Sequence, residues 1–141
     1  MPHGAMSISA SALSANRVRL NVIAENLANA NTTRTENGTP YRRRVTRLES
    51  EAPPFASLLP GAPGAEGRGV RVAGVTPVGE TRRQYMPGHP DADRDGYVEL
   101  PNVNPVVEMT DMMAATRAYE ANVTAIQALK SMAQKALELG R

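Results

Sequence analysis

The positions of apolar and polar residues divide the chain into three parts. In residues 7–29, and again from residue 105 onward, apolar residues recur every three or four positions, which places them on one side of an α-helix. Between residues 32 and 101, glycines and prolines separate short runs of alternating apolar and polar residues, such as YRRRVTRL, GVRVAGVTPV and GYVEL. The pattern predicts a mainly α protein with two long terminal helices and a small β-rich insert.

The first helix is expected to be apolar on two sides. Leu13, Leu20 and Leu27 follow one another at intervals of seven residues and are joined by Ile23, whereas Val22 lies on a different side. A helix that is apolar on two sides must be covered on two sides. The second long helix can cover one of them in a coiled-coil-like pair. Because the chain offers no third long helix, we expect neighbouring chains to cover the other.

The second helix has clear signals at its boundaries. Asn104 suits the N-cap position, and Pro105 suits the first helical position. Glu108 lies near the positively polarised end of the helix, and Gly140 follows its last expected turn. The sequence therefore predicts one helix from residue 105 to the end of the chain.

Two series of residues run along nearly opposite sides of this helix. A heptad seam with two polar interruptions consists of Met109, Met112, Thr116, Tyr119, Val123, Ile126, Lys130, Ala133 and Leu137. The second series consists of Ala114, Ala118, Ala121, Ala125, Ala128 and Met132. Small side chains let helices approach closely, so we expect a neighbouring chain on the second series. The predicted assembly contacts are Leu13, Leu20, Ile23 and Leu27 with Met112, Tyr119, Val123 and Ile126, and an alanine face of Ala114, Ala118, Ala121 and Ala125.

The stretch NVIAENLANANTT is unusual for a helix because it contains four asparagines. Each costs a helix roughly half a kcal/mol relative to alanine. Asparagines beside a helix seam can fix its register through directional hydrogen bonds, which indicates a helix specified for its position in an assembly. The same residues are explained equally well if Asn21 and Asn29 face solvent and Asn26, Asn29 and Asn31 end the helix.

Composition mainly excludes classes of chemistry. The 141 residues include no cysteine, which excludes disulfides, thiolate metal sites and cysteine nucleophiles. The 16 basic and 14 acidic residues nearly balance, which is a weak argument for nucleic-acid binding. His3 and His89 have no serine or carboxylate at a spacing that suggests a catalytic set. We therefore expect neither an enzyme nor a bound cofactor.

A basic run, residues 42–44 with Arg47, raises the alternative of nucleic-acid binding. Alternation along a strand would put Arg42 and Arg44 on one face and Arg43 on the other. The chain has only one phenylalanine and four tyrosines for stacking on bases. A solvated face, or one that forms salt bridges between subunits, is the favoured interpretation.

The stretch DADRDGYVE resembles the first half of an EF-hand calcium loop. Asp91, Asp93 and Asp95 stand at alternate positions, with a glycine in sixth place. The twelfth position is Asn102 instead of a carboxylate, and the preceding PGHP cannot form the entering helix. We expect a turn into the strand GYVEL, with aspartates that accept backbone N–H bonds. The alternative is a calcium-binding regulatory module built on residues 91–96.

The chain resembles the flagellar basal-body rod proteins, and most closely their proximal-rod members, in four segments. These are ISASALSANRVRLNVIAENLANANTTRT, PYRRR, GHPDADRDGYVELPNVNPVVEMTDMMAATRAYEANV and ALKSMAQKALEL. The first is shared across the flagellar axial proteins, and the third is much more specific. Residues 52–69 match nothing recognisable, and their Pro/Gly/Ala content indicates a mobile loop.

The resemblance implies a structural, non-enzymatic subunit that transmits torque by packing. It implies that residues 1–31 and 102–141 form the axial core as paired helices, with the insert of residues 32–101 outside. The implied partners are copies of the chain itself, other proximal-rod proteins, the adaptor at the rod base and the membrane-ring protein.

The resemblance also changes the expected location. The chain has no basic, apolar secretory signal at its start and no window of the ~20 apolar residues that span a membrane. Alone, this pattern indicates a cytoplasmic protein without membrane insertion. The resemblance implies instead export by the flagellar type III apparatus, without a cleaved signal peptide, and assembly in the periplasmic rod.

Overall fold

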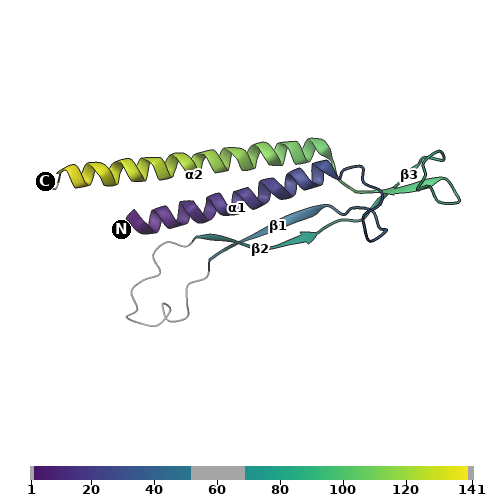
Figure 1. Ribbon diagram of the computed structural model, residues 1–141, viewed down its shortest axis with the longest axis horizontal. Helices are drawn as coiled ribbons and strands as arrows, with labels where there is room; N and C mark the ends of the chain where they lie inside the picture. Colours follow the sequence, from purple (N-terminus) through teal and green to yellow (C-terminus); the bar gives the residue numbers. More distant parts are fainter. Residues whose placement is uncertain (1, 52–68, 140–141) are drawn as a thin grey trace, which may run out of the picture.

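The structure, a computed structural model, describes residues 2–51 and 69–139. In chain order its elements are α1 (Pro2–Ala28), β1 (Arg44–Ser50), β2 (Val70–Pro77), β3 (Arg82–Tyr85), β4 (Tyr97–Leu100) and α2 (Pro105–Leu139). The two helices lie side by side and run in opposite directions, so that the start of α1 and the end of α2 lie at the same end of the molecule (Figure 1). The predicted class, two terminal helices around a small β insert, is therefore confirmed.

The observed start of α2 agrees with the start predicted from the sequence, whereas the observed start of α1 differs from it. Asn104 Oδ1 accepts a hydrogen bond of 3.0 Å from the backbone N–H of Val106, which confirms the predicted N-cap. α1 begins at Pro2, whereas the sequence predicted a start near residue 7. Proline is tolerated in a first turn because its missing N–H would have no helical partner there. Gly140, and residues 52–68 of the predicted loop, lie outside the described residues.

α1 is the middle of three layers. α2 packs along one side of it, and the two-stranded antiparallel sheet β1–β2 packs along the other (Figure 1). In that sheet Ser50 pairs with Val70, and the register shifts at a bulge between Arg47 and Leu48. The expectation that a neighbouring chain must cover the second side of α1 is wrong, because the sheet of the same chain covers it.

Ser11 and Gly69 hold the start of β2 against α1. Ser11 Oγ accepts a hydrogen bond of 3.0 Å from the backbone N–H of Val70, and it donates one of 2.7 Å to the carbonyl oxygen of Ile8. A Cβ atom at Gly69 would lie 2.7 Å from Ser11 Oγ. Only glycine therefore allows the chain to approach the helix this closely without a shift.

A second two-stranded sheet lies beyond the end of the helical pair (Figure 1). β3 and β4 are antiparallel, and the paired rings of Tyr85 and Tyr97 meet edge to face at 5.3 Å between centroids. β4 corresponds to the predicted strand GYVEL, in which Val98 and Leu100 are buried. β3 was not predicted. All four of its residues are exposed, so it lacks an apolar alternation.

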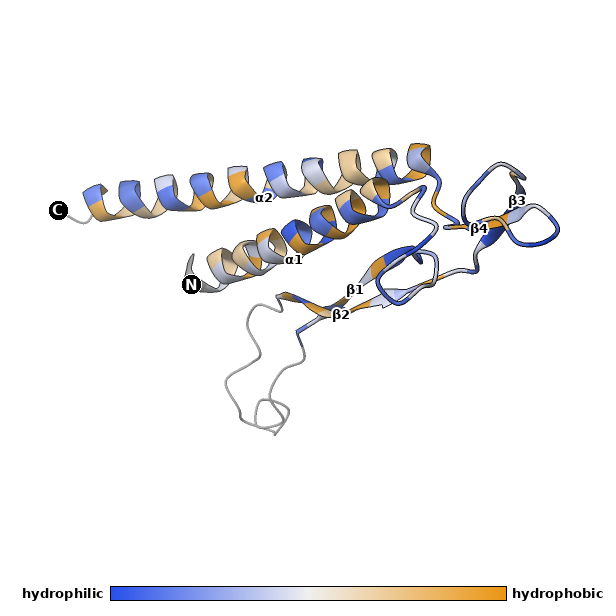
Figure 2. Cartoon of the chain, turned by 45° about the vertical axis from the view of Figure 1, so that its right-hand side comes forward, coloured by the Kyte–Doolittle hydropathy of each residue, from blue (hydrophilic) through white to orange (hydrophobic). Residues whose placement is uncertain are grey.

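The buried core is small, and hydrophobic residues extend well beyond it. Hydrophobic and hydrophilic positions alternate along the whole of α2, including the part that continues past the start of α1 (Figure 2). Neither of the described helices combines the length and the apolar character needed to cross a membrane.

Candidate functional site

The contact between α1 and α2 is centred on alanines that the sequence analysis did not assign to it. Ala15 of α1 is 2% exposed and Ala115 of α2 is 0% exposed. At about 100° per residue, position 115 falls between the heptad seam and the alanine face. α1 therefore lies against the ridge between the two predicted series, and each series flanks the contact.

The predicted assembly residues differ in how far the chain itself covers them. Ile23 is buried, and the others of the seam prediction are half-buried: Leu13, Leu20, Leu27, Met112, Tyr119, Val123 and Ile126. On the alanine face, Ala118 and Ala125 are half-buried, whereas Ala114 and Ala121 are exposed. One flank of α2 is thus available to another molecule.

Larger apolar side chains are also exposed on α2. Met109, Met113, Met132 and Leu137 are each more than half exposed. Met109 and Met113 line a shallow groove together with Met112, Thr116 and Arg117. Contiguous exposed apolar residues, such as Met109 and Met113 in this groove, are typical of a surface that contacts another protein.

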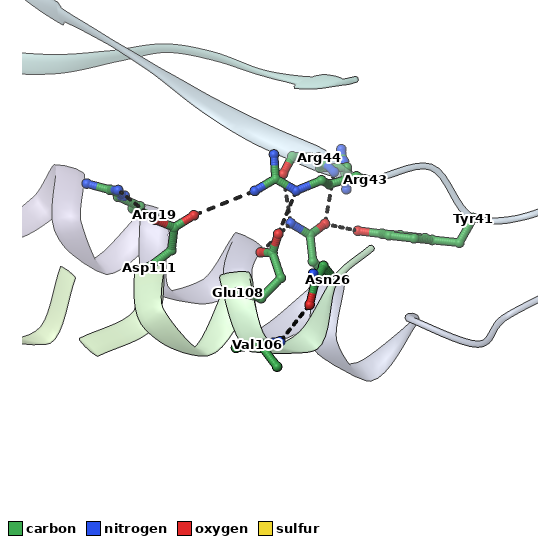
Figure 3. Close-up of polar contacts among 9 residues, drawn as sticks. Arg19, Asn26, Tyr41, Arg43, Arg44, Val106, Glu108 and Asp111 are labelled. Atoms are coloured by element: carbon green, nitrogen blue, oxygen red, sulfur yellow. Dashed lines mark hydrogen bonds and ion pairs between the residues drawn. The ribbon is translucent and has the colours of Figure 1, made fainter. Parts of the chain in front are cut away.

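A buried polar junction joins α1, the start of β1 and the start of α2 (Figure 3). Asn26 Nδ2 donates to the carbonyl oxygen of Arg44 at 2.8 Å and to Glu108 Oε2 at 3.0 Å. Asn26 Oδ1 accepts from the hydroxyl of Tyr41 and from the backbone N–H of Arg44, both at 2.8 Å. The two donors and the two acceptor positions of this amide are all used.

Ion pairs extend the polar junction toward its rim. Glu108, which is 1% exposed, accepts a hydrogen bond from Arg43 Nε through its second oxygen. Arg44 Nη1 donates to Glu25 Oε1 at 2.8 Å. Asp111 lies between Arg43 and Arg19, at 3.6 and 3.9 Å from their nearest nitrogens (Figure 3). The expectation of a solvated or intersubunit basic face is wrong for Arg43, which pairs with the buried Glu108. Arg44 pairs within the chain as well, but 43% of its side chain stays exposed.

Burial and charge shift two pKa values in the polar junction. Burial, reinforced by the negative charges of Glu25 and Glu108 and opposed by Arg44, raises the pKa of Tyr41 to about 12. The hydroxyl therefore stays protonated at neutral pH and remains a donor to Asn26. The hydrogen bond to Glu25 raises the pKa of Arg44 above its ordinary value.

The asparagines of NVIAENLANANTT have separate roles. Asn26 is buried and makes directional hydrogen bonds, but its partners belong to the same chain. Asn29 Nδ2 donates to the carbonyl oxygen of Glu25 near the end of α1, and Asn21 and Asn31 are exposed.

Sequence analysis missed Tyr41 as a member of the polar junction. The sequence does contain a signal for Asn26 at the centre of the polar junction. Asn26 follows the buried Val22 and Ile23 by four and three residues, which places it on the same side of the helix.

Asp93 organises the turn before β4. Its Oδ1 accepts from the backbone N–H groups of Asp95 at 3.0 Å and Tyr97 at 2.8 Å, and its Oδ2 accepts from Arg83 at 2.6 Å. The hydrogen bond from Tyr97 is the main cause that lowers the pKa of Asp93. The predicted turn, with aspartate as acceptor of backbone N–H groups, is confirmed.

Asp91, the first aspartate of DADRDGYVE, contacts a different segment of the chain from Asp93. Asp91 Oδ2 accepts a hydrogen bond of 2.7 Å from Thr33 Oγ1. Within residues 2–51 and 69–139, no three acidic or histidine side chains are grouped so that they could hold a metal ion. No observation therefore favours the calcium-binding alternative.

Comparison with known proteins connects both helices with one protein family. Residues 6–34 match the family model described as flagella basal body rod protein, and residues 94–139 match the flagellar basal body rod FlgEFG protein C-terminal model. Among curated proteins, flagellar basal-body rod protein FlgC of Bacillus subtilis is 46% identical over 144 residues, which cover 96% of each chain. FlgC of Escherichia coli is 43% identical over 135 residues, with 95% of this chain and 94% of the relative covered. FlgC of Aquifex aeolicus is 37% identical over 138 residues, with 95% and 93% covered.

Proposed function

The chain belongs to the FlgC family of flagellar basal-body rod proteins and is a structural subunit of that rod, and we propose that it assembles through the exposed surfaces of its terminal helices. The observation that carries this proposal is the apolar surface of α2 that no described part of the chain covers. Met109, Met113 and Leu137 are each more than half exposed on one helix. A rod subunit uses such surface to bind its neighbours.

The proposed contacts are divided between the inside and the outside of the subunit. α1 and α2 form a coiled-coil-like pair, with residues 1–31 and 102–141 as the axial core and residues 32–101 outside it. The seam residues Leu13, Leu20, Ile23, Leu27, Met112, Tyr119, Val123 and Ile126 hold the pair together and present their remaining surface to neighbours. The alanine face of Ala114, Ala118, Ala121 and Ala125 receives a helix of a neighbouring chain. The exposure of Ala114 and Ala121 supports this division.

The subunit transmits torque by packing. The polar junction contributes to this role because Asn26 and Glu108 bind α1, β1 and α2 to one another. A force applied to one of these elements therefore reaches the others through hydrogen bonds and an ion pair, which resist sliding more directionally than apolar contacts do. No enzymatic activity and no cofactor form part of this proposal.

The finer assignment of location and partners rests on family membership. The subunit is exported by the flagellar type III apparatus without a cleaved signal peptide, and it occupies the periplasmic part of the basal-body rod. Its partners are copies of itself, other proximal-rod proteins, the adaptor at the rod base and the membrane-ring protein. It binds no nucleic acid and does not insert into the membrane.

Substitution of Ala121 tests the proposed alanine face. In Ala121→Leu the larger side chain fits the lone subunit, where the position is exposed, but collides with a close neighbour at a cost of ~1 to 3 kcal/mol per contact. We expect normal export and helix content but incomplete rods in isolated basal bodies. Ala121→Ser, which keeps a small side chain at the same position, should give complete rods.

Two further variants separate assembly from folding. Val123→Asp puts a charge beside the α1–α2 contact and should reduce both helix content and assembly. Ala115→Leu overpacks the fully buried centre of that contact and should do the same. Motile cells with full rods in the Ala121→Leu strain would show that the alanine face has no close neighbour.

A further inference from the structure

Three methionines of α2 share one face of the helix. At about 100° per residue, Met113 lies about 40° from Met109 around the helix axis, and Met112 lies about 60° to the other side. All three line the shallow groove described above, which Thr116 and Arg117 complete. Met109 is 58% exposed, Met113 is 56% exposed, and Met112 is half-buried. Two methionine side chains of one groove are therefore accessible to small solutes in the lone subunit.

A methionine thioether can change its polarity without any change in the chain. Hydrogen peroxide transfers one oxygen atom to the sulfur, so that the thioether is oxidised to a sulfoxide and the peroxide is reduced to water. The flexible apolar side chain thereby becomes polar, and enzymatic reduction of the sulfoxide reverses the change. Accessible methionines react in this way more readily than buried ones, and Met109 and Met113 meet that condition.

We propose that Met109 and Met113 form an oxidation site at which a peroxide controls assembly of the subunit. As thioethers, they present adaptable apolar surface to a neighbouring chain. As sulfoxides, they bring polar oxygen atoms into a contact that excludes water, and burial of a polar group without a partner is unfavourable. Because this site lies on the surface proposed above for assembly, its role rests on that function and adds chemical control of it.

Met132 provides a comparison within the same helix. It is 58% exposed, as Met109 is, but it does not line the groove. At about 100° per residue it lies about 140° from Met109 around the helix axis, on another side of α2. Equal exposure predicts similar oxidation of Met109 and Met132 by peroxide. A difference in their effects on assembly therefore reports on the groove and not on oxidation in general.

Peroxide treatment of the purified full chain tests the site directly. Mass spectrometry of peptides locates the sulfoxides, and sedimentation at increasing protein concentration measures assembly. We expect oxidation of Met109, Met113 and Met132 in dilute solution, with helix content unchanged. The oxidised chain should require a roughly tenfold or greater concentration to assemble. Enzymatic reduction of the sulfoxides should restore assembly, and in the assembled chain Met109 and Met113 should be protected from peroxide.

Substitutions separate the groove methionines from the others. Met109→Leu combined with Met113→Leu keeps apolar side chains of similar size, so this chain should assemble normally and resist peroxide. Met109→Gln combined with Met113→Gln imitates the polarity of the sulfoxides and should weaken assembly roughly tenfold or more without peroxide. Met132→Leu, the matched control, should remain as sensitive to peroxide as the wild type. A double-leucine chain as sensitive as the wild type, or a double-glutamine chain that assembles normally, overturns the proposed oxidation site.

Basal bodies isolated from cells separate this oxidation site from the proposed function. The double-leucine strain should yield complete rods, and the double-glutamine strain should yield incomplete ones. If the wild-type chain is present in basal bodies and the double-glutamine strain also yields complete rods, the oxidation site is wrong and the assembly function stands. Absence of the wild-type chain from basal bodies would overturn the proposed function itself.

Discussion

Asn26 determines how α1, β1 and α2 meet. An amide with two donors and two acceptor positions is satisfied in one arrangement of its partners, and here those partners come from three segments. Apolar contacts would tolerate a shift along the helices much better than these hydrogen bonds do. Asparagine thus contributes specificity at a position where leucine would contribute only burial.

Replacement of Asn26 should therefore cost far more than replacement of another asparagine in the same helix. Asn26→Ala leaves the Tyr41 hydroxyl, the Arg44 backbone and Glu108 without their partner, at ~1 to 3 kcal/mol for each buried group. We expect the free energy of unfolding to fall by about 3 kcal/mol or more. Asn21→Ala, at an exposed position, should change it by less than about 0.5 kcal/mol. Urea unfolding followed by circular dichroism measures both.

The raised pKa of Tyr41 predicts a loss of stability in alkaline solution. The folded state holds this proton up to a pKa of about 12, whereas an unfolded chain releases it near 10. Between these values the folded state binds more protons, so stability is present below pH 10 and falls as pH rises toward 12. Tyr41→Phe should be less stable at pH 8 because it lacks the bond to Asn26, but it should show a shallower decline. Equal slopes for the two proteins in unfolding experiments from pH 9 to 12 would contradict this account.

For a single residue, the sequence indicates which type of interaction it makes better than it indicates which residue is its partner. Directional hydrogen bonding by the helical asparagines could be inferred from their cost to a helix. The actual partners of Asn26 lie 15, 18 and 82 positions away, and helical spacing says nothing about contacts at such separations. Glu108 was interpreted through the helix dipole, a local effect, and its ion pair with Arg43 depends on the fold.

The close packing of α1 against α2 and β2 depends on small residues at the points of contact. Ala15 and Ala115 allow the helices to meet, and Gly69 allows β2 to begin against Ser11. The interaxial distance of packed helices follows from the side chains at the contact. Larger residues at these three positions would separate the layers and expose the apolar residues between them.

Gly69→Ala should weaken the attachment of the β1–β2 sheet to α1. The added Cβ would lie 2.7 Å from Ser11 Oγ, which forces a shift and disturbs the hydrogen bond to Val70. We expect a loss of ~1 to 3 kcal/mol in the free energy of unfolding. Gly74→Ala, within β2, is the control, because a Cβ there meets nothing within 4 Å. Thermal unfolding of both variants should therefore show a lower midpoint for Gly69→Ala alone.

Elements with strong local signals could be predicted, and those formed by tertiary pairing could not. Asn104 and Pro105 predict the start of α2 because capping is a local interaction. β3 has no such signal, since RRQY is exposed throughout and becomes a strand only by pairing with β4. The cover of α1 by β1–β2 was missed for a related reason. An insert of short strands does not reveal from its sequence which helix it packs on.

The whole molecule is thick at one end of the helical pair and thin at the other. Near the polar junction α1 has neighbours on two sides, whereas the last part of α2 continues alone past the start of α1 (Figure 1). Apolar surface on this free part contributes no burial free energy until a second molecule covers it. The outer contacts could be predicted from the sequence only as apolar faces, because a single chain does not specify what covers them.

Hydrogen exchange in dilute solution should follow this change in thickness. Backbone amides of α2 after residue 133 should exchange fastest among the helical amides, because their side chains are exposed and none of the elements that the structure describes packs there. Amides near Val22 and Ile23 should exchange slowest, since both residues are buried. Mass spectrometry at increasing protein concentration should show the end of α2 becoming protected as copies assemble. Uniform exchange along α2 at low concentration would contradict this picture.

The position of the polar junction also has a mechanical consequence. The directional contacts between Asn26 and Glu108 hold the helical pair at one end, and alanine contacts follow farther along it. A rod that is fixed at one end is displaced most at its free end. The tip of α2 should therefore show the largest thermal displacement in a lone subunit. Neighbouring subunits that bind this tip would hold α2 at both ends and reduce its displacement. Stiffness of the rod would then arise on assembly, and a single subunit would not need to possess it.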